Sequence, residues 1–334
     1  METSELEIDK RILNLSYSSL LTLHSCPRKF QLYKLGADVS TEPEVTESVT
    51  FAYGHVIGSG IQHLLEGMEM DEVIWKAFLE WDCDLFADNP KQNKSFFGAI
   101  HALRQFDSMR ANGYLAGYEI VRYKDKPACE LSFAIRLPDG FIYRGFVDAV
   151  LRNTITGKVI VLECKTTSST AVNPAQYKNS AQAIGYSIVL DAIFPILSDY
   201  EVLYLAYQSK SQEYIQLSFN KSYYQRALWI QELLLDIEVI KLYEREGIYP
   251  MRGESCFSWY RECEYYNNCT LSTNLLTAPL SPEGSEALDK QLEEYQIQIT
   301  LEDLVRAQLT KPHPHSQALK SAPTTSTLTE DEIL

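Results

Sequence analysis

The spacing of apolar residues changes once along the chain. Before Gly117, apolar side chains recur every three or four residues, as on one face of a helix, and after it they alternate with polar ones, as in a β-strand. The first part therefore predicts a helical layer. Its expected helices begin at Ser16 and at Pro27 and lie near 52–68, 71–87 and 95–112.

The alternating part predicts a sheet. Its expected strands lie at 118–122, 130–137, 142–151 and 158–166, and after a helix near 174–190 come strands at 201–208 and 213–219 and a long helix near 221–246. Asp, Asn and Gly in the connectors between the early strands favour hairpin turns. The fold class we expect is α/β, with a mixed central β-sheet flanked by helices, an N-terminal helical layer and a C-terminal cysteine loop.

The chain divides into a domain and a tail. We expect one domain over residues 12–272 and an acidic, partly disordered tail over 273–334. Within the tail, 284–309 has the pattern of an amphipathic helix. The Pro- and His-containing stretch 311–315 and the Ser- and Thr-rich stretch 321–329 are typical of disordered segments.

Composition narrows the class of protein. No apolar run is long enough for a membrane span, and the start of the chain lacks the features of a signal peptide, so we expect a cytoplasmic protein without membrane contact. Seven cysteines in such a chain disfavour a secreted disulfide framework. A net charge of −15 disfavours a passive nucleic-acid coat but is compatible with a DNA-cutting enzyme that has a local basic groove.

Two neighbouring strands carry candidate catalytic chemistry. Alternation along 159–165 places Glu163 and Lys165 on one face and Cys164 on the other, and Asp148 lies within the preceding apolar strand. Two carboxylates that converge at adjacent strand ends repel each other unless a cation lies between them, and hard oxygen ligands suit Mg²⁺ or Mn²⁺. The alternative is a structural ion pair in which Lys165 neutralises one of the acids.

The helix that follows adds two polar residues and completes a pattern. Gln182 and Tyr186 are four residues apart and so share one helical face. A Gly followed by an Asp on a strand, then Glu163-Cys164-Lys165-Thr166, then Gln-X-X-X-Tyr on a helix resembles the PD-(D/E)XK nuclease superfamily, specifically its RecB-like branch. That branch includes phage exonucleases and CRISPR-associated RecB-like nucleases. The resemblance covers most of the chain up to Cys269.

The resemblance implies a role for each of these residues. Asp148 and Glu163 would hold the divalent metal, with the main-chain carbonyl of Cys164 as a third ligand. Lys165 would position the attacking water, and Gln182 and Tyr186 would support the lysine or the DNA backbone. The implied fold is a restriction-endonuclease-like core, and the implied activity is metal-dependent hydrolysis of DNA to products with 5′-phosphates.

The sequence departs from the family pattern at two places. Val147 precedes Asp148 where relatives have proline, which leaves the carboxylate in place. Gly58 stands where many relatives have the histidine of a Gly-X-X-X-His motif, and His63 or Gln62 is the candidate substitute for that metal ligand. An acidic position sometimes seen in this branch corresponds to Glu130, for which an ordinary polar-face role is the alternative.

Four cysteines form the second signal. Cys256, Cys263 and Cys269 cluster near the end of the expected domain, and Cys26 lies alone near its start. Thiolates bind Zn²⁺ or iron–sulfur clusters, and the absence of tight Cys-X₂₋₄-Cys pairs favours a [4Fe–4S] cluster over zinc. Some RecB-like nucleases have the same one-plus-three arrangement around a cluster that joins the chain ends. The alternative is four unrelated thiols, and Cys83 and Cys129 fit neither arrangement.

These observations predict a metal-dependent deoxyribonuclease. The expected activity is that of an exonuclease acting in recombination, repair or phage DNA processing, on DNA that is single-stranded or has free ends. Recombination or helicase proteins are candidate partners. Two alternatives stay open, a non-catalytic DNA-binding or assembly subunit that keeps the nuclease fold and a site-specific endonuclease.

Overall fold

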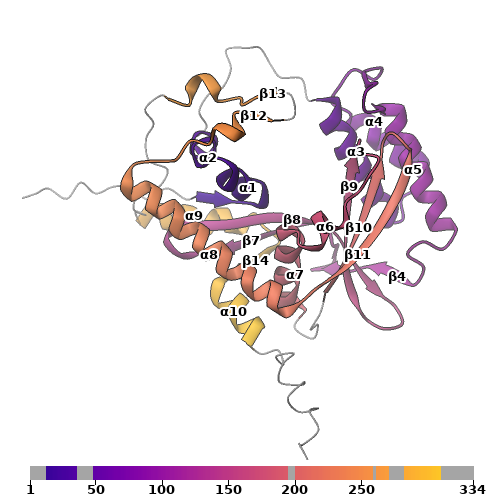
Figure 1. The fold of residues 1–334 in the computed structure, drawn as a ribbon. Coiled ribbons are helices and arrows are strands. Elements are labelled where there is room, and N and C mark those ends of the chain that lie inside the picture. Colours follow the sequence, from indigo (N-terminus) through magenta and orange to yellow (C-terminus); the bar gives the residue numbers. More distant parts are fainter. Residues whose placement is uncertain (1–12, 36–47, 195–199, 259–260, 271–281, 310–334) are drawn as a thin grey trace, which may run out of the picture.

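A computed structural model describes residues 13–35, 48–194, 200–258, 261–270 and 282–309. A mixed β-sheet lies at the centre, with helices on both of its faces (Figure 1). The expected α/β class with a flanked mixed sheet is therefore confirmed. Among the described residues, no helix is both long and apolar enough to cross a membrane.

The N-terminal part begins with a short strand and two helices. Strand β1 (Leu13–Leu15) pairs in parallel with the central sheet. Helix α1 (Tyr17–Ser25) is capped by Ser16, whose hydroxyl accepts from the backbone N–H of Ser19, and α2 (Pro27–Lys34) has proline at its first position, where a missing N–H costs nothing. Both predicted helix starts are confirmed, and Cys26 lies between the two helices.

Three helices cover one face of the sheet. They are α3 (Val49–Leu65), α4 (Met70–Glu80) and α5 (Phe96–Ala111), with the short hairpin of β2 (Asp88–Asn89) and β3 (Lys94–Ser95) before α5. Their apolar faces form a core with Ile160, Leu162 and Leu205 of the sheet. Gly60 lets α3 approach α5 closely, because a Cβ there would lie 2.6 Å from the methyl carbons of Leu103. This is the helical layer that the sequence predicts, except that the helix expected near 71–87 ends at Glu80.

The sheet has the order β11-β10-β9-β8-β7-β14, with β1 and β4 (Tyr118–Ile120) also paired with β8. Its main strands are β7 (Cys129–Arg136), β8 (Phe141–Asn153), β9 (Val159–Thr167), β10 (Tyr200–Gln208) and β11 (Glu213–Lys221). Strands β7, β8 and β9 form antiparallel neighbours, whereas β9 and β10 are parallel. A parallel pair needs a crossover, and here helices provide it. A separate small hairpin joins β5 (Arg122–Tyr123) to β6 (Lys126–Pro127).

The crossover and a long helix cover the second face. Helices α6 (Pro174–Lys178) and α7 (Ala181–Ile193) connect β9 to β10, and α8 (Tyr223–Glu246) packs on α7, where Gly185 lies against Trp229. The sequence predicts one helix near 174–190, but the chain leaves helical geometry at Asn179 and Ser180. This break starts a new helix one residue before Gln182.

The last described segment belongs to the sheet. Helix α9 (Pro282–Glu293), strand β14 (Ile297–Thr300) and helix α10 (Leu301–Leu309) replace the single amphipathic helix expected over 284–309. Strand β14 pairs in parallel with β7, and Ile297 and Ile299 are buried in the core. These side chains alternate with polar ones over only four residues. Such a short alternation cannot be distinguished from the helical pattern of the residues on either side. The disorder predicted for 311–315 and 321–329 concerns residues outside the described ranges.

Candidate active site

The candidate centre lies where β8 and β9 separate. Their ladder ends at the pair of Ala149 and Leu162, and the next residues, Asp148 and Glu163, flank the opening. The backbone N–H of Cys164 donates to Asp148 Oδ2 at 2.9 Å, so the carboxylate takes the place of a strand partner. The two acids that the sequence singles out are therefore brought together at one point of the sheet.

A chain of polar contacts runs from β9 to α7. Lys165 Nζ lies 2.5 Å from Glu163 Oε1, and the expectation that both side chains share one face of the strand is confirmed. The same Nζ donates to Gln182 Oε1 at 3.2 Å, and Gln182 Nε2 donates to the Tyr186 hydroxyl at 2.6 Å. Because Gln182 and Tyr186 lie one turn apart at the start of α7, the helix aims both at the lysine.

Burial sets the electrostatics of this group. Desolvation and the nearby charge of Glu163 raise the pKa of Asp148 well above its ordinary value. Desolvation also raises the pKa of Glu163, against the opposing effect of Lys165. Burial alone would lower the pKa of Lys165, but the charges of Glu163 and Asp148 outweigh it and raise that pKa. One lysine thus faces two buried carboxylates, so a further cation beside these carboxylates would be stabilised by their charge.

The donor set fits a hard divalent cation. The Glu163 side chain is fully buried, and apart from Lys165 no hydrogen-bond donor of the described residues reaches its carboxylate oxygens. Such buried acceptors normally have a partner. Within the described ranges no three His, Cys, Asp or Glu side chains are grouped to hold a metal ion. Two carboxylates suffice for Mg²⁺, which usually binds one or two and takes its other ligands from water and substrate phosphate.

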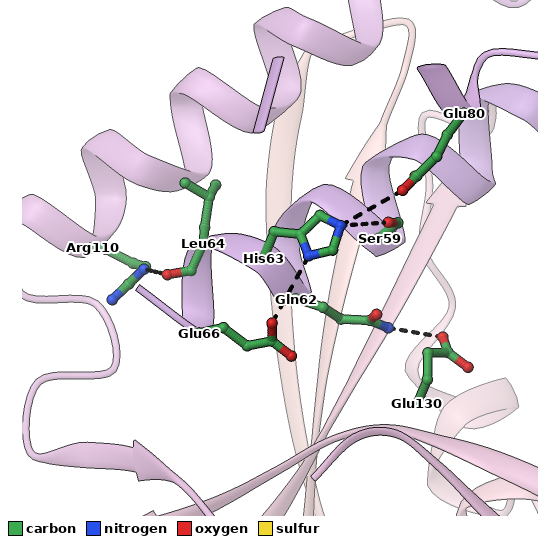
Figure 2. Close-up of polar contacts among 8 residues, drawn as sticks. All are labelled: Ser59, Gln62, His63, Leu64, Glu66, Glu80, Arg110 and Glu130. Atoms are coloured by element: carbon green, nitrogen blue, oxygen red, sulfur yellow. Dashed lines mark hydrogen bonds and ion pairs between the residues drawn. The ribbon is translucent and has the colours of Figure 1, made fainter. Parts of the chain in front are cut away.

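Glu130 and Gln62 stand at the edge of this centre. Glu130 of β7 adopts a positive φ of 45° in place of regular strand geometry, and Gln62 Nε2 of α3 donates to its Oε1 at 2.8 Å (Figure 2). The charge of Glu130 contributes to the raised pKa values of Asp148 and Glu163. Of the two candidate substitutes on α3, Gln62 is therefore the one that reaches the acidic group.

His63 points elsewhere. Its Nε2 lies 3.6 Å from Glu80 Oε1 of α4, and its Nδ1 lies 3.9 Å from Glu66 Oε2 (Figure 2). The structure thus places His63 between α3 and α4 and does not bring it together with Asp148 and Glu163. Gly58, one turn before Gln62, faces open space, since a Cβ there would meet no atom within 4 Å.

The four cysteines gather at the ends of the domain. Burial raises the pKa of Cys269, and charges on Cys26, Cys256 and Cys263 raise it further, so these three thiols lie within electrostatic reach of Cys269. The backbone N–H of Cys263 donates to the carbonyl of Cys256 at 2.8 Å. The side chains do not form a ready metal cage, because no three ligating side chains of the described residues are grouped for one. Thiols are soft donors of the kind that bind zinc as well as iron–sulfur clusters.

Backbone contacts hold these segments together. The backbone N–H of Arg28 donates to the Pro250 carbonyl at 3.1 Å, and its Nε donates to the Cys269 carbonyl at 2.8 Å. The Ser255 hydroxyl donates to the carbonyl of Ser25 at 2.8 Å. The hairpin of β12 (Phe257–Ser258) and β13 (Arg261–Glu262) lies within this region. These hydrogen bonds bring the segment of Cys26 next to the segment that contains Cys256, Cys263 and Cys269.

Comparison with known proteins identifies a family. The model of the PD-(D/E)XK nuclease superfamily matches residues 14–270. Among solved structures, a provisionally named exonuclease from Eubacterium rectale is 12% identical, with a TM-score of 0.42 over 77% of this chain and 91% of its own. The protein SSO0001 is 16% identical, with a TM-score of 0.27 over 77% of this chain and 100% of its own. No curated protein matches the sequence.

Proposed function

The chain is a member of the PD-(D/E)XK nuclease superfamily, and we propose that it hydrolyses DNA phosphodiester bonds with Mg²⁺ or Mn²⁺. One observation carries the proposal. The buried carboxylate of Glu163, beside Asp148, is paired with Lys165 at the opening between two strands. A purely structural ion pair would instead be shielded from solvent on all sides. The side chain of Lys165 is 36% exposed, so a substrate can reach it.

Each residue of the centre has a distinct task in this proposal. Asp148 and Glu163 would hold the metal, with the Cys164 carbonyl as third ligand. When bound, the metal supplies Lewis-acid stabilisation of the charge that develops on the phosphate and favours ionisation of the attacking water. Lys165 donates hydrogen bonds toward the scissile phosphate and orients the water. Gln182 and Tyr186 fix the lysine in that position.

We further propose that the enzyme is an exonuclease of the RecB-like branch. Its substrate would be DNA with free ends or single-stranded DNA, its products would carry 5′-phosphates, and its place of action would be the cytoplasm, beside recombination or helicase proteins. A site-specific endonuclease would use the same residues. A non-catalytic subunit is the remaining alternative, and the missing side chain at Gly58 favours it.

A time course on linear and circular DNA, each single- and double-stranded, tests these proposals. With Mg²⁺ or Mn²⁺ we expect loss of linear DNA only, and none with a chelator. Glu163→Gln and Lys165→Ala should each lower the rate by about 10²- to 10³-fold. The matched control is Glu201→Gln, because Glu201 of β10 forms a 2.6 Å ion pair with Lys158, which directly precedes β9. Undiminished cleavage by Lys165→Ala would refute the assignment, and cleavage of circular DNA would indicate an endonuclease.

We also propose that Cys26, Cys256, Cys263 and Cys269 hold a [4Fe–4S] cluster. The electrostatic influence of the other three thiols on Cys269 and the hydrogen bond from Arg28 Nε to the Cys269 carbonyl support this proposal. Protein purified without oxygen should be brown and contain iron and sulfide in equal amounts. Cys26→Ser should lose the visible absorbance, whereas the control Cys83→Ser should keep it. Colourless protein that contains zinc would contradict the cluster.

A further inference from the structure

Helix α3 borders the candidate active site. A Cβ on Gly54 would lie 3.2 Å from Oγ1 of Thr166, which directly follows Lys165 in β9 and lies on the opposite face of that strand. One turn later Gly58 faces open space, and one turn further Gln62 reaches Glu130 beside the acidic group. The stripe of Gly54, Gly58 and Gln62 therefore leads from the end of β9 to the acidic group.

A pair of stacked rings flanks this stripe. Phe51 and His55 lie one turn apart on α3, with ring centroids 6.4 Å apart and ring planes 6° from parallel. Phe51 is 64% exposed, and the His55 side chain is exposed as well. Large apolar side chains gain free energy by burial, so an aromatic ring left on the surface next to an active site is available to a ligand.

The two rings border a cavity of about 420 Å³. Its other walls among the described residues are Ser48, Thr50 and Gly54, so this part of the lining carries no carboxylate and offers hydroxyl groups beside the rings. Such a lining suits a flat, neutral heterocycle with polar edges. A phosphate group would find no cation among these residues.

Cations lie on the neighbouring turns. The Thr50 hydroxyl donates to Gln92 Oε1 at 3.0 Å, which joins α3 to the turn between β2 and β3, and Asn93 Nδ2 contacts the carbonyl of Lys210 at 3.5 Å in the turn between β10 and β11. Lys91 and Lys210 of these two turns are both exposed, as are Asp88 and Glu213 in the strands beside them. A polyanion that places a heterocycle in the cavity thus meets two lysines beyond its rim, each with an acid nearby.

We propose that Phe51 and His55 form a stacking platform for an unpaired base of the DNA strand that reaches Lys165. This inference rests on the proposed nuclease function and specifies its substrate class. Inside a duplex both faces of every base are covered by neighbouring bases, so a protein ring stacks on an unpaired base or at a duplex end. The substrate in the centre is then single-stranded DNA or the frayed end of a duplex.

The test measures DNA binding by the full-length protein with Glu163→Gln, which prevents cleavage. Fluorescence anisotropy compares a labelled single strand with a duplex whose two ends are closed by hairpin linkers. Phe51→Ala should weaken binding of the single strand about tenfold, while Phe51→Tyr retains it. The control Tyr224→Ala removes an aromatic ring of similar exposure, 73%, near the N-terminal end of another Ser-capped helix, and should leave binding unchanged.

A second measurement reports stacking itself. A single strand that contains 2-aminopurine should lose fluorescence on binding, and the loss should be smaller with Phe51→Ala or His55→Ala than with Phe51→Tyr. The platform would be refuted if Phe51→Ala bound the single strand as tightly as the protein that retains Phe51. It would also be refuted if Tyr224→Ala weakened binding as much as Phe51→Ala. If metal-dependent cleavage is present and only the effects of Phe51 are missing, this inference fails while the proposed function stands. Absence of both cleavage and DNA binding would refute the two together.

Discussion

Lys165 is held between oxygen atoms from two different elements. Glu163 Oε1 supplies one from its own strand, and Gln182 Oε1 supplies the other from α7. A lysine side chain has four rotatable bonds, so two anchors restrict its ammonium group to a narrow region. Gln182 is therefore a positioning residue, which acts through the lysine.

We predict that Gln182→Leu lowers kcat for DNA cleavage about tenfold and leaves KM nearly unchanged, because the lysine loses its orientation and the DNA contacts remain. Tyr186→Phe should cost less, since it removes only the acceptor of the Gln182 amide and leaves the contact between Gln182 and Lys165. Steady-state kinetics on a labelled linear substrate, beside thermal unfolding of each variant, provides the measurement. A rise in KM with constant kcat would show that Gln182 binds substrate directly.

The sequence predicts which way the side chains of β9 point but not which residue of α3 reaches the site, and the reason is geometric. Strand alternation has a period of two, so the common face of Glu163 and Lys165 follows from their spacing alone. Adjacent residues of a helix point about 100° apart, so the choice between Gln62 and His63 depends on the rotation of α3 about its axis. That rotation is set by packing against α4 and α5, which no local pattern of the sequence encodes.

At the scale of elements, the edge of the sheet depends on a strand of four residues. Strand β14 covers β7 in the register Ile297 with Phe133, and its two isoleucines are 2% and 7% exposed. Because β7 pairs with β8, the strand of Asp148, β14 lies two strands away from the centre. Most strands and helices follow their sequence patterns, but β14 shows that a short strand between two helices lacks the length needed to reveal its period.

We predict that Ile297→Ala and Ile299→Ala each lower the free energy of unfolding by about 2–5 kcal/mol, since each removes a buried branched side chain. Gln298→Ala, on the exposed face between them, should change it by less than about 0.5 kcal/mol. Urea unfolding followed by circular dichroism gives the values. Equal effects at positions 297 and 298 would mean that β14 does not pack on the sheet in solution.

At the scale of the whole molecule, the two ends of the matched region close on each other. Residues near Cys26 contact the segment from Pro250 to Cys269, more than two hundred residues away in sequence, through Arg28 and through an ion pair of Lys29 with Glu264 at 3.2 Å. Closing so long a loop costs chain entropy that grows only slowly with length. A few local contacts can therefore hold it, and a bound cluster would add to them.

We predict that Arg28→Met makes the segment 250–269 more susceptible to limited proteolysis, because it removes the Nε donor from the Cys269 carbonyl. Lys29→Met should have little effect, since Lys29 and Glu264 form an exposed ion pair. The decisive measurement is a double-mutant cycle of Arg28→Met with Cys26→Ser, read by the proteolysis rate. If Cys26 and Arg28 stabilise the same contact between the chain ends, the second substitution raises the proteolysis rate by a smaller factor in the double mutant than it does as a single change. Strict additivity would show that Cys26 and Arg28 stabilise separate parts of the fold, and the cysteines would then not act as the staple that joins the chain ends.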